Sequence, residues 1–413
     1  MTNITAILTV IDENCFLPRR SEQLRVDRGR PVNTYSNQTH PDRSIRGRNR
    51  FRSYVSQRPT LKRILLPLVE CSEMALNIVG RRLPSLIKPR TGNISLAITS
   101  QCNLRCLGCR YGRDFMPGAR LDLTSVKNLI DDAAALGIRW IRFYGGEPLV
   151  HTDLGSMISY ATNRGVHSWI STNAALLNGP KFHELRRAGL HGVAIGLYGV
   201  NEEYDWYVQK KGAFETLEHN LKELRKGPGQ DFDLHFSWLL AAHTCKVDAL
   251  REAWSLAERF NAHFHVDIVH EGGSLPYFTD GPHGCLRLDD SCRQLEEVVT
   301  ELLRLRRSSP IRYREPIASI RAIPDWVGTG KQMDVPCDMY KHIWIGPDGS
   351  VKLCYSGFAL GNINVCSLRD ILYTADHAAA ARSAFLLRCP KCHCNRDIRI
   401  KRDLEARVRY GWS

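Results

Sequence analysis

Strand-like apolar runs alternate with helix-like amphipathic segments between residues 93 and 270 of this chain. Thr124, Ser125 and Asp153 stand where two of these helices would begin, and all three are residue types that cap helix N-termini. The expected strands are 93–99, 139–143, 166–171, 191–198, 232–239 and 263–268. The expected helices lie near 124–136, 153–164, 180–188, 213–226 and 247–260. Six strand–helix repeats of this length predict a parallel sheet, either open or closed into a partial barrel.

The segments that flank these repeats have other patterns. Residues 67–80 place apolar side chains at helical spacing, with Pro67 near the expected start and Gly80 at the end. Such a helix would pack on the barrel or lie on a membrane surface, and packing is the commoner outcome. One further helix is expected near 289–306. The expected division is 1–58, a basic and poorly ordered arm; 59–92, the amphipathic helix and lead-in; 93–270, the strand–helix repeats; 271–336, a bridge; and 337–413, a small Cys-rich module with a basic tail.

Composition places the chain among ordinary soluble proteins. Its 413 residues are 43% hydrophobic and 24% charged, and the length suits one large domain and a smaller one. No run approaches the ~18 apolar residues of a membrane span. The N-terminal sequence MTNITAILTVIDENCFLPRR lacks a basic region before its short apolar stretch, so it is a poor signal peptide. We therefore expect a cytoplasmic protein.

The net charge of +14 is concentrated near the N-terminus, where residues 1–90 hold 17 Lys and Arg against 7 Asp and Glu. A basic arm of this kind can attract nucleic acid, an acidic membrane surface or an acidic partner. We favour the simpler interpretation, a solvated arm with little apolar surface to bury. The charge therefore does not define the function, and a nucleic-acid partner is not expected.

Eight of the 14 cysteines form two groups whose spacing indicates metal binding. The first group is Cys102, Cys106 and Cys109 in ITSQCNLRCLGCRYG, directly after the first expected strand. In a β/α barrel this is the C-terminal mouth, where active sites lie. Three thiolates so close in sequence can hold three irons of a cubane and leave the fourth open to a small molecule. A zinc site would need a fourth ligand nearby, and neither His nor Cys follows closely.

With this motif, residues 93–270 resemble the core of the radical S-adenosylmethionine (SAM) superfamily. The resemblance implies a partial (β/α)6 barrel in which the three Cys hold a 4Fe–4S cluster and SAM binds the open iron. In the family, electron transfer into SAM gives methionine and a 5′-deoxyadenosyl radical, which abstracts hydrogen from a substrate. Relatives usually have an aromatic or bulky residue before the third Cys, in contact with adenine. Here that residue is Gly108, and Tyr111 is a candidate replacement.

FYGGEPLVH follows the second expected strand. Gly145 and Gly146 allow the backbone to approach a ligand closely, and Glu147 can accept hydrogen bonds from an ammonium group. Two glycines before Glu147 and Pro148 can also form a simple turn. The motif resembles the family's GGEP motif, which holds the amino group of SAM, and its place one strand–helix unit after the Cys motif favours that role.

ISTNAALL follows the third expected strand. Ser171, Thr172 and Asn173 present hydroxyl and amide groups that suit a ribose or a carboxylate, although such residues also serve as helix caps. Many relatives have Thr-Asn-Gly here, so Ala174 is a departure from the family pattern.

IGLYGVNEEYD follows the fourth expected strand, where relatives commonly have Ser-Leu-Asp-Gly. Gly196 and Tyr198 replace the Ser and the Asp, so the roles of those two positions do not carry over. Tyr198 would still point towards the mouth of the barrel, which makes it a candidate catalytic residue.

The second Cys group lies in the C-terminal module. A Pro-Asp-Gly turn predicts a hairpin that brings Cys337 and Cys354 together, and a later C-x-x-C pair would close a four-thiolate site. Alone, these residues would also suit a zinc ribbon. The pattern C-x(11)-G-x(4)-C, then Gly-Asn-Ile, then C-x-x-C resembles the SPASM and twitch modules of radical SAM enzymes, and the shorter twitch form fits better. The implied ligands of an auxiliary 4Fe–4S cluster are Cys337, Cys354, Cys389 and Cys392, with Cys394 either a spare thiol or a ligand in place of a neighbour.

The resemblance covers about residues 93–395 and implies an oxidoreductase that takes electrons from a reductant such as flavodoxin or ferredoxin. The first ninety residues do not have the pattern of a peptide-leader domain, so we expect net oxidation (dehydrogenation) of a small molecule. The alternatives are a radical epimerase, in which a thiol such as that of Cys394 donates hydrogen, and a peptide-modifying enzyme. A rival from another class is a zinc protein whose basic arm binds nucleic acid.

Overall fold

The computed structural model describes residues 59–226, 232–270, 277, 281–288, 294–328, 333–355, 357–389, 392 and 394–412, so the expected basic arm lies outside the described residues. The chain divides into two compact units, Met1–Ser72 and Glu73–Ser413. Helix α3 (Pro59–Arg82) spans this division. The predicted helix is confirmed, but its expected start is wrong, because Pro67 lies inside α3. A long helix tolerates the hydrogen bond that one internal proline removes.

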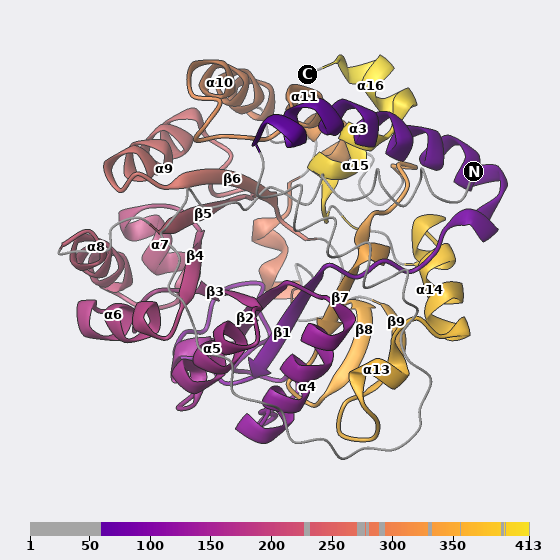
Figure 1. The fold of residues 1–413 in the computed structure, drawn as a ribbon. Coiled ribbons are helices and arrows are strands. Elements are labelled where there is room, and N and C mark those ends of the chain that lie inside the picture. The colour runs from indigo at the N-terminus through magenta and orange to yellow at the C-terminus, as the bar shows by residue number, and fades with distance from the viewer. Residues whose placement is uncertain are drawn as a thin grey trace. The chain divides into compact units, whose positions relative to one another are not determined.

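Parallel strands form the centre of the Glu73–Ser413 unit (Figure 1). They are β1 (Asn93–Thr99), β2 (Trp140–Gly145), β3 (His167–Thr172), β4 (Leu190–Leu197), β5 (Asp233–Leu240) and β6 (His263–Ile268). Each strand pairs in parallel with the next one in the sequence. The expected strands are thereby confirmed, with ends that differ by one or two residues.

Helices connect these strands as the pattern predicts. They are α4 (Leu123–Leu136), α5 (Leu154–Asn163), α6 (Gly179–Arg187), α8 (Ala213–Leu224) and α9 (Val247–Arg259). The expected caps of α4, Thr124 and Ser125, are wrong, whereas Asp153 occupies the N-cap position of α5 as expected. Asp122 caps α4 by accepting a hydrogen bond from Ser125 N at 2.9 Å, and Asp153 precedes α5 without a capping hydrogen bond from its side chain. Helix α7 (Asn201–Val208), between β4 and α8, is an addition that the sequence pattern does not predict.

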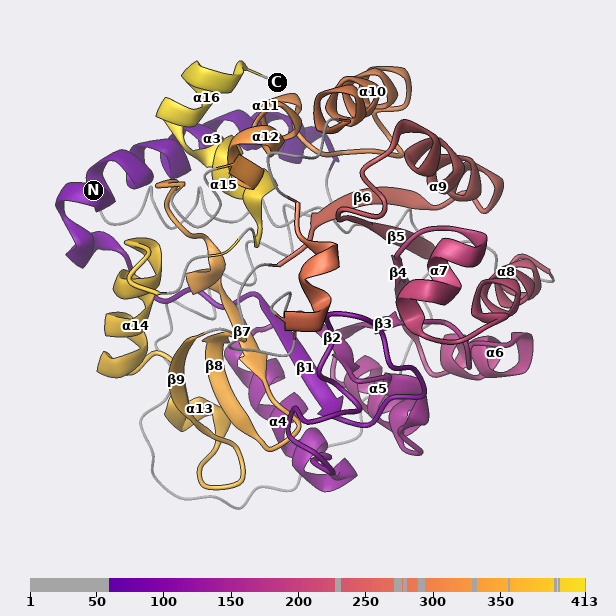
Figure 2. The ribbon, with the colours of Figure 1, turned by 180° about the vertical axis from the view of Figure 1, so that it is seen from behind.

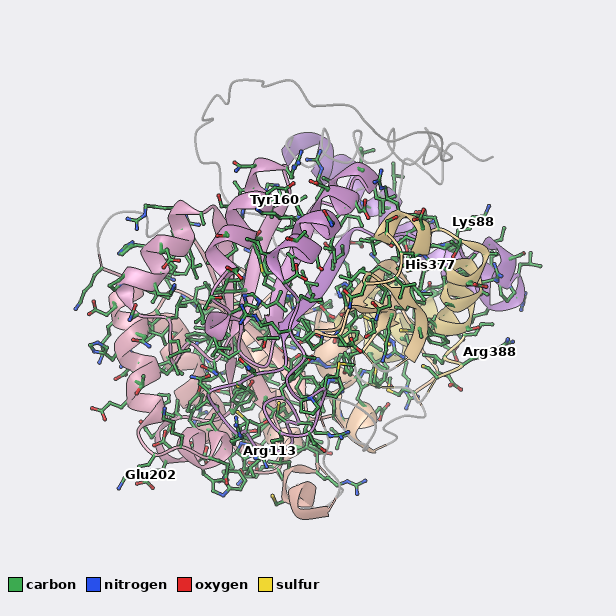
Figure 3. All side chains as sticks on the ribbon, turned by 90° about the horizontal axis from the view of Figure 1, so that it is seen from below. Lys88, Arg113, Tyr160, Glu202, His377 and Arg388 are labelled. Carbon is green, nitrogen blue, oxygen red and sulfur yellow. The ribbon has the colours of Figure 1, made fainter. Side chains whose placement is uncertain are left out.

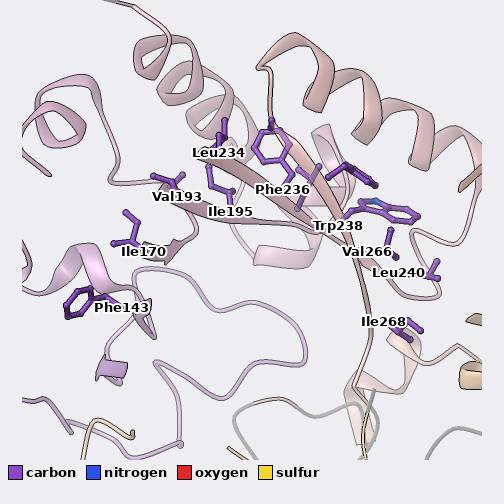
Figure 4. Close-up of a cluster of buried hydrophobic side chains, with 14 of the residues drawn as sticks. Phe143, Ile170, Val193, Ile195, Leu234, Phe236, Trp238, Leu240, Val266 and Ile268 are labelled. Carbon is purple, nitrogen blue, oxygen red and sulfur yellow. The ribbon is translucent and has the colours of Figure 1, made fainter. Parts of the chain in front are cut away.

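One face of the sheet packs against the connecting helices and forms the hydrophobic core. Figure 4 shows part of this core: Phe143, Ile170, Val193, Ile195, Leu234, Phe236, Trp238, Leu240, Val266 and Ile268. Side chains alternate between the two faces of a strand, so the intervening residues point to the opposite face. The side chains on that face are polar and are less buried than those of the core. Among them are Tyr144, Ser171, His235 and Asp267. The chemistry of the fold therefore belongs to this polar face and to the ends of its strands.

The Cys-rich C-terminal segment continues the same sheet. β7 (His342–Ile345) pairs in parallel with β1, and β8 (Ser350–Cys354) and β9 (Gly357–Asn362) follow it in antiparallel pairing. In the described residues the strand order is β6-β5-β4-β3-β2-β1-β7-β8-β9. The predicted hairpin is confirmed: Gly349 in its turn has a φ of 81°, and Asp348 Oδ1 accepts a hydrogen bond from Ser350 N at 3.0 Å.

The remaining helices lie at the two edges of this sheet. α10 (Leu295–Ser308), α11 (Ile317–Arg321), α12 (Ile323–Gly328), α15 (Arg396–Arg402) and α16 (Leu404–Tyr410) pack together beyond β6 (Figure 2). α13 (Leu368–Ile371) and α14 (Ala375–Phe385) pack against β9. Short 3₁₀ helices are η1 (Pro84–Leu86), η2 (Pro148–Val150), η3 (Gly281–Leu286) and η5 (Met339–Lys341). Within the described ranges, every helix is too short or too polar to cross a bilayer.

Candidate active site

The loops that carry the sequence motifs follow β1, β2, β3 and β4. Parallel strands share a direction, so these loops meet at one end of the sheet. Figure 3 shows Arg113, in the loop after β1, and Glu202, at the start of α7, at the same end of the unit. Tyr160, near the end of α5, lies at the opposite end.

Glu147 is the residue at which the loops at this end of the sheet are hydrogen-bonded together. Its side chain is fully buried and accepts three hydrogen bonds: from Thr172 Oγ1 (2.7 Å) and Leu149 N (3.0 Å) at Oε1, and from Asn173 N (2.8 Å) at Oε2. Asn173 Nδ2 donates to Asn103 Oδ1 in the Cys loop at 2.9 Å. Three motifs that are far apart in the sequence thus meet at one carboxylate.

Burial raises the pKa of Glu147 to about 7, although the hydrogen bonds from Asn173, Leu149 and Thr172 favour the carboxylate and act the other way. A carboxyl group with such a pKa changes charge near neutral pH. A bound cation would favour its ionised form. The site is therefore suited to a positively charged group such as an ammonium.

Gly145 and Gly146 are required by the chain's own backbone. A Cβ on Gly145 would lie 2.2 Å from the Thr99 carbonyl oxygen, and a Cβ on Gly146 would lie 2.1 Å from that of Gln101. The close approach allows Gly146 N to donate to Thr99 O and Glu147 N to donate to Gln101 O, both at 2.9 Å. The glycines therefore fix the β2 loop against the Cys loop, a reason that the sequence does not reveal. Pro148 is buried and begins η2 directly after Glu147.

Cys102, Cys106 and Cys109 lie half-buried in the loop after β1. Burial, the largest effect, raises the pKa of all three thiols, that of Cys109 to about 12. The thiols of Cys109 and Cys102 raise the pKa of Cys106 further, so both lie close enough to act on it electrostatically. Metal binding deprotonates such thiols, and the positive charge of the metal offsets the cost of burying the thiolates.

Three thiols can bind a zinc ion or an iron–sulfur cluster, and the two hold their sulfurs differently. Zinc–sulfur bonds of about 2.3 Å would hold two thiolates roughly 3.8 Å apart. A cubane spreads its thiolates over separate irons, so the first group suits an iron–sulfur cluster.

Tyr198 lies at the same end of the sheet, at the carboxyl end of β4. Its ring stacks on that of Tyr207, with centroids 4.3 Å apart, and its hydroxyl folds back over Gly196, where a Cβ would lie 2.2 Å from the oxygen. The two departures from the family pattern are therefore neighbours in space, because Tyr198 in this rotamer fills the position of a side chain at residue 196. Tyr207, on the unpredicted α7, also accepts a hydrogen bond at its carbonyl from Leu107 N at 2.8 Å. Ser171 lies half-buried on β3.

Backbone conformation explains why glycine, and not a bulky residue, stands before the third Cys of the motif. Gly108, between Cys106 and Cys109, has a φ of 68°, a conformation in which a side chain is strained. Tyr111, the candidate replacement, packs within the chain itself. It is 2% exposed and packs edge-on against Phe115, with ring centroids 5.0 Å apart.

The second Cys group also converges. Cys337 is buried, burial raises the pKa of its thiol to about 12, and Cys392 and Cys354 raise it further through their charges. The guanidinium of Arg399 acts the other way and donates to the Cys392 carbonyl at 2.9 Å. Cys389 is half-buried in the same segment. The structure thus brings Cys337, Cys354 and Cys392 together.

Cys394 contacts Cys392 and a group of rings that the sequence does not indicate. Its sulfur lies 3.0 Å from the Tyr355 hydroxyl, which also lies 3.0 Å from His270 Nε2. Tyr277 packs edge-on against Tyr355, with ring centroids 5.9 Å apart, and forms an isolated backbone bridge with Cys109. Rings therefore lie between the two Cys groups. Tyr355 could have been suspected from the sequence, because it directly follows Cys354. Nothing in the sequence around Tyr277 indicates its place beside Cys109.

Comparison with known proteins supports this arrangement. Residues 96–229 match the model of the Radical SAM superfamily. The chain is 35% identical over 152 residues to Fe-coproporphyrin III synthase of Methanosarcina barkeri, covering 35% of this chain and 38% of the relative. It is 28% identical over 176 residues to AdoMet-dependent heme synthase of the same organism, covering 42% and 49%. The chain thus spans less than half the length of these two relatives. PqqA peptide cyclase of Gluconobacter oxydans is 24% identical over 278 residues, covering 66% and 73%.

Solved structures show the same fold at lower identity. SuiB of Streptococcus suis bound to S-adenosylmethionine has a TM-score of 0.55 and 13% identity, covering 82% of this chain and 80% of that one. anSMEcpe with bound AdoMet has a TM-score of 0.54 and 14% identity, covering 72% and 81%. These likenesses concern the fold, a partial barrel of the radical SAM type with further strands and helices after it.

Proposed function

This chain belongs to the radical SAM superfamily, and we propose that it cleaves SAM reductively and uses the resulting radical to oxidise a substrate. The family uses a 4Fe–4S cluster and SAM, and its SPASM-type members carry auxiliary clusters. The observation that carries the proposal is the convergence of the Cys loop, the GGEP loop and the loop after β3 at Glu147.

The chain's own groups have separate tasks in this proposal. Cys102, Cys106 and Cys109 would hold the SAM-binding cluster, and residues 145–148 and 171–173 would line SAM. When bound, these groups supply an electron and a 5′-deoxyadenosyl radical. Glu147 Oε1 already accepts two hydrogen bonds, whereas Oε2 accepts one and has a lone pair left for the methionine ammonium.

The direction of the reaction is proposed from the second Cys group. Cys337, Cys354, Cys389 and Cys392 would supply four ligands and leave no open iron, which suits a cluster that carries electrons. A substrate radical that loses an electron to such a group gives net oxidation. We propose a small molecule as the substrate and flavodoxin or ferredoxin as the reductant. The long match to a peptide cyclase favours a peptide as the second candidate.

The role of Glu147 predicts how SAM affinity changes with mutation and pH. Glu147→Ala removes an acceptor for the ammonium and should weaken SAM binding by about 2 kcal/mol, or about 30-fold. Because the folded protein holds the pKa of Glu147 at about 7, wild-type affinity should fall as pH decreases from 8 to 6 and the carboxylate is protonated. Isothermal titration of SAM into the reconstituted protein measures both effects.

The Glu147→Ala variant should keep its clusters, and its SAM affinity should no longer depend on pH between 6 and 8. Glu202→Ala, at an exposed acidic residue at the start of α7, is the control and should bind SAM as the wild type does. Equal SAM affinity in Glu147→Ala and the wild type would mean that the GGEP match is only a turn.

Product mass tests the direction of the reaction. Net oxidation should give a product two mass units lighter than the substrate and consume one SAM per product. Epimerisation, with a thiol such as that of Cys394 donating hydrogen, should leave the mass unchanged in water and add one deuterium in deuterium oxide. Mass spectrometry after turnover in both solvents distinguishes them. The second result would replace the oxidase proposal with the epimerase.

A further inference from the structure

Asp233, His235 and His263 form a side-chain group that the proposed reaction does not use. Asp233 and His235 are two residues apart on β5, so their side chains share one face of the sheet. His263, the first residue of β6, pairs directly with His235 in the parallel register. Asp233 and His263 begin their strands, so the group lies at the amino ends of the strands, opposite the end that carries Glu147.

These side chains present their ligand atoms to one another. One ligand atom from each residue lies within 4.8 Å of the other two, and among the described residues no other three His, Cys, Asp or Glu side chains meet this criterion. The rings of His235 and His263 are 4.7 Å apart between centroids, and all three residues are partly buried. Two imidazoles and a carboxylate form a donor set that first-row divalent metals prefer.

The environment of His263 favours metal binding through one nitrogen. Its Nδ1 lies 3.2 Å from the Ile311 carbonyl oxygen, which can only accept a hydrogen bond, so Nδ1 carries the hydrogen and Nε2 presents its lone pair. A ligand histidine in proteins is commonly oriented by such a hydrogen bond from its other nitrogen. Burial lowers the pKa of both His263 and His235, which keeps the imidazoles neutral at physiological pH.

Arg314, Arg142 and Arg186 bring positive charge near this group, and Arg314 contacts one of its ligand atoms. Arg314 Nη2 lies 3.5 Å from His263 Nε2, beyond the length of a strong hydrogen bond, and the Arg314 side chain is exposed. Burial raises the pKa of Asp233, and the charges of Arg314, His191 and Arg186 act the other way. The exposed Arg314 guanidinium can turn into solvent. The competing contact is therefore weak.

We propose that Asp233, His235 and His263 bind one divalent transition-metal ion of the zinc class. Three protein ligands leave at least one position for water or an anionic group, so the site is an open one. Bound metal also joins the amino ends of β5 and β6. The proposal does not depend on SAM chemistry.

The proposed metal site is tested by measuring how much zinc the complete protein retains, with its clusters in place, and which atoms surround that zinc. The reconstituted protein is incubated anaerobically with zinc sulfate, desalted, and analysed for zinc and iron by mass spectrometry. The wild type should retain about one zinc per chain with three or four nitrogen or oxygen neighbours at about 2.0–2.1 Å in X-ray absorption at the zinc edge. Asp233→Asn and His263→Gln should each lose that zinc and keep their iron.

His167→Gln is the matched control, because His167 begins β3 as His263 begins β6 and lies outside the group. It should retain zinc as the wild type does. No retained zinc in the wild type, equal retention in Asp233→Asn and His263→Gln, or a sulfur shell at about 2.3 Å would each overturn the proposal. If both variants fail to fold, the ligand shell of the wild type decides.

Discussion

Replacing Cys102, Cys106 and Cys109 together by alanine should remove about four of about eight irons and abolish formation of 5′-deoxyadenosine from SAM. Iron and sulfide analysis, with chromatography of SAM products under dithionite, measures both effects.

The matched control replaces three exposed cysteines, Cys71, Cys285 and Cys366, by alanine. This variant should keep all of its iron and its activity. A Cys102/Cys106/Cys109 variant that still makes 5′-deoxyadenosine would contradict the proposed function. Colourless wild-type protein with zinc and no iron would favour the rival zinc protein.

The strands were predictable because their sequence pattern is local. The strands are short segments in which apolar residues are frequent, and in β5 buried apolar residues alternate with less buried ones. The Cys, GGEP and Ser-Thr-Asn motifs were predictable for a related reason, since each directly follows a strand. Once the strands are parallel, their following loops must meet.

Long-range features were not predictable in the same way. β7 pairs with β1, which precedes it by more than two hundred residues, and no local pattern selects that partner. Helix α7 has only eight residues, too few for a clear helical period, although Tyr204 and Tyr207 bury their rings beside the Cys loop. Tyr277 lies outside every predicted element, so only the fold brings it to Cys109.

The residues that differ from the family pattern also show what a sequence alone does not reveal. Gly196 and Tyr198 replace two residues of the family pattern, and the Tyr198 phenol occupies the space that a side chain at position 196 would need. Ala174 stands where relatives have glycine, and its φ of 58° shows why glycine suits that position. A sequence shows which residue is replaced, whereas the structure shows what the replacement must fit.

A buried ion network beside Cys337 has the largest expected effect on stability. Glu73 is 3% exposed and contacts Lys341 Nζ at 2.5 Å and Arg90 Nη1 at 3.0 Å. Lys341 also contacts Asp338 Oδ1 at 2.8 Å. Burial alone would raise the pKa of Glu73, but the charges of Lys341, Arg402 and Arg90 outweigh it and hold the pKa well below its usual range. The carboxylate therefore balances cations that are themselves buried.

Glu73→Gln keeps the shape of the side chain and removes its charge, so Lys341 and Arg402 should be left in excess over Asp338. Breaking a buried pair in this way should cost about 3–5 kcal/mol, which lowers the midpoint of thermal unfolding by about 4–7 °C. Because Asp338 adjoins Cys337, the auxiliary iron should be lost before the iron held by the first Cys group on heating. Calorimetry and iron release on the anaerobic protein measure both effects.

Glu405→Gln is the control, because the Glu405 side chain is 85% exposed and meets Arg81 at 3.5 Å. It should change stability by less than about 0.5 kcal/mol. The depressed pKa of Glu73 gives the sign of the pH effect: its stabilisation is present above the ordinary pKa of 4.5 and is lost as pH falls below it. The difference between the wild type and Glu73→Gln should therefore shrink in acid. A difference that stays constant from pH 7 to pH 4 would mean that packing, and not charge, is what Glu73 contributes.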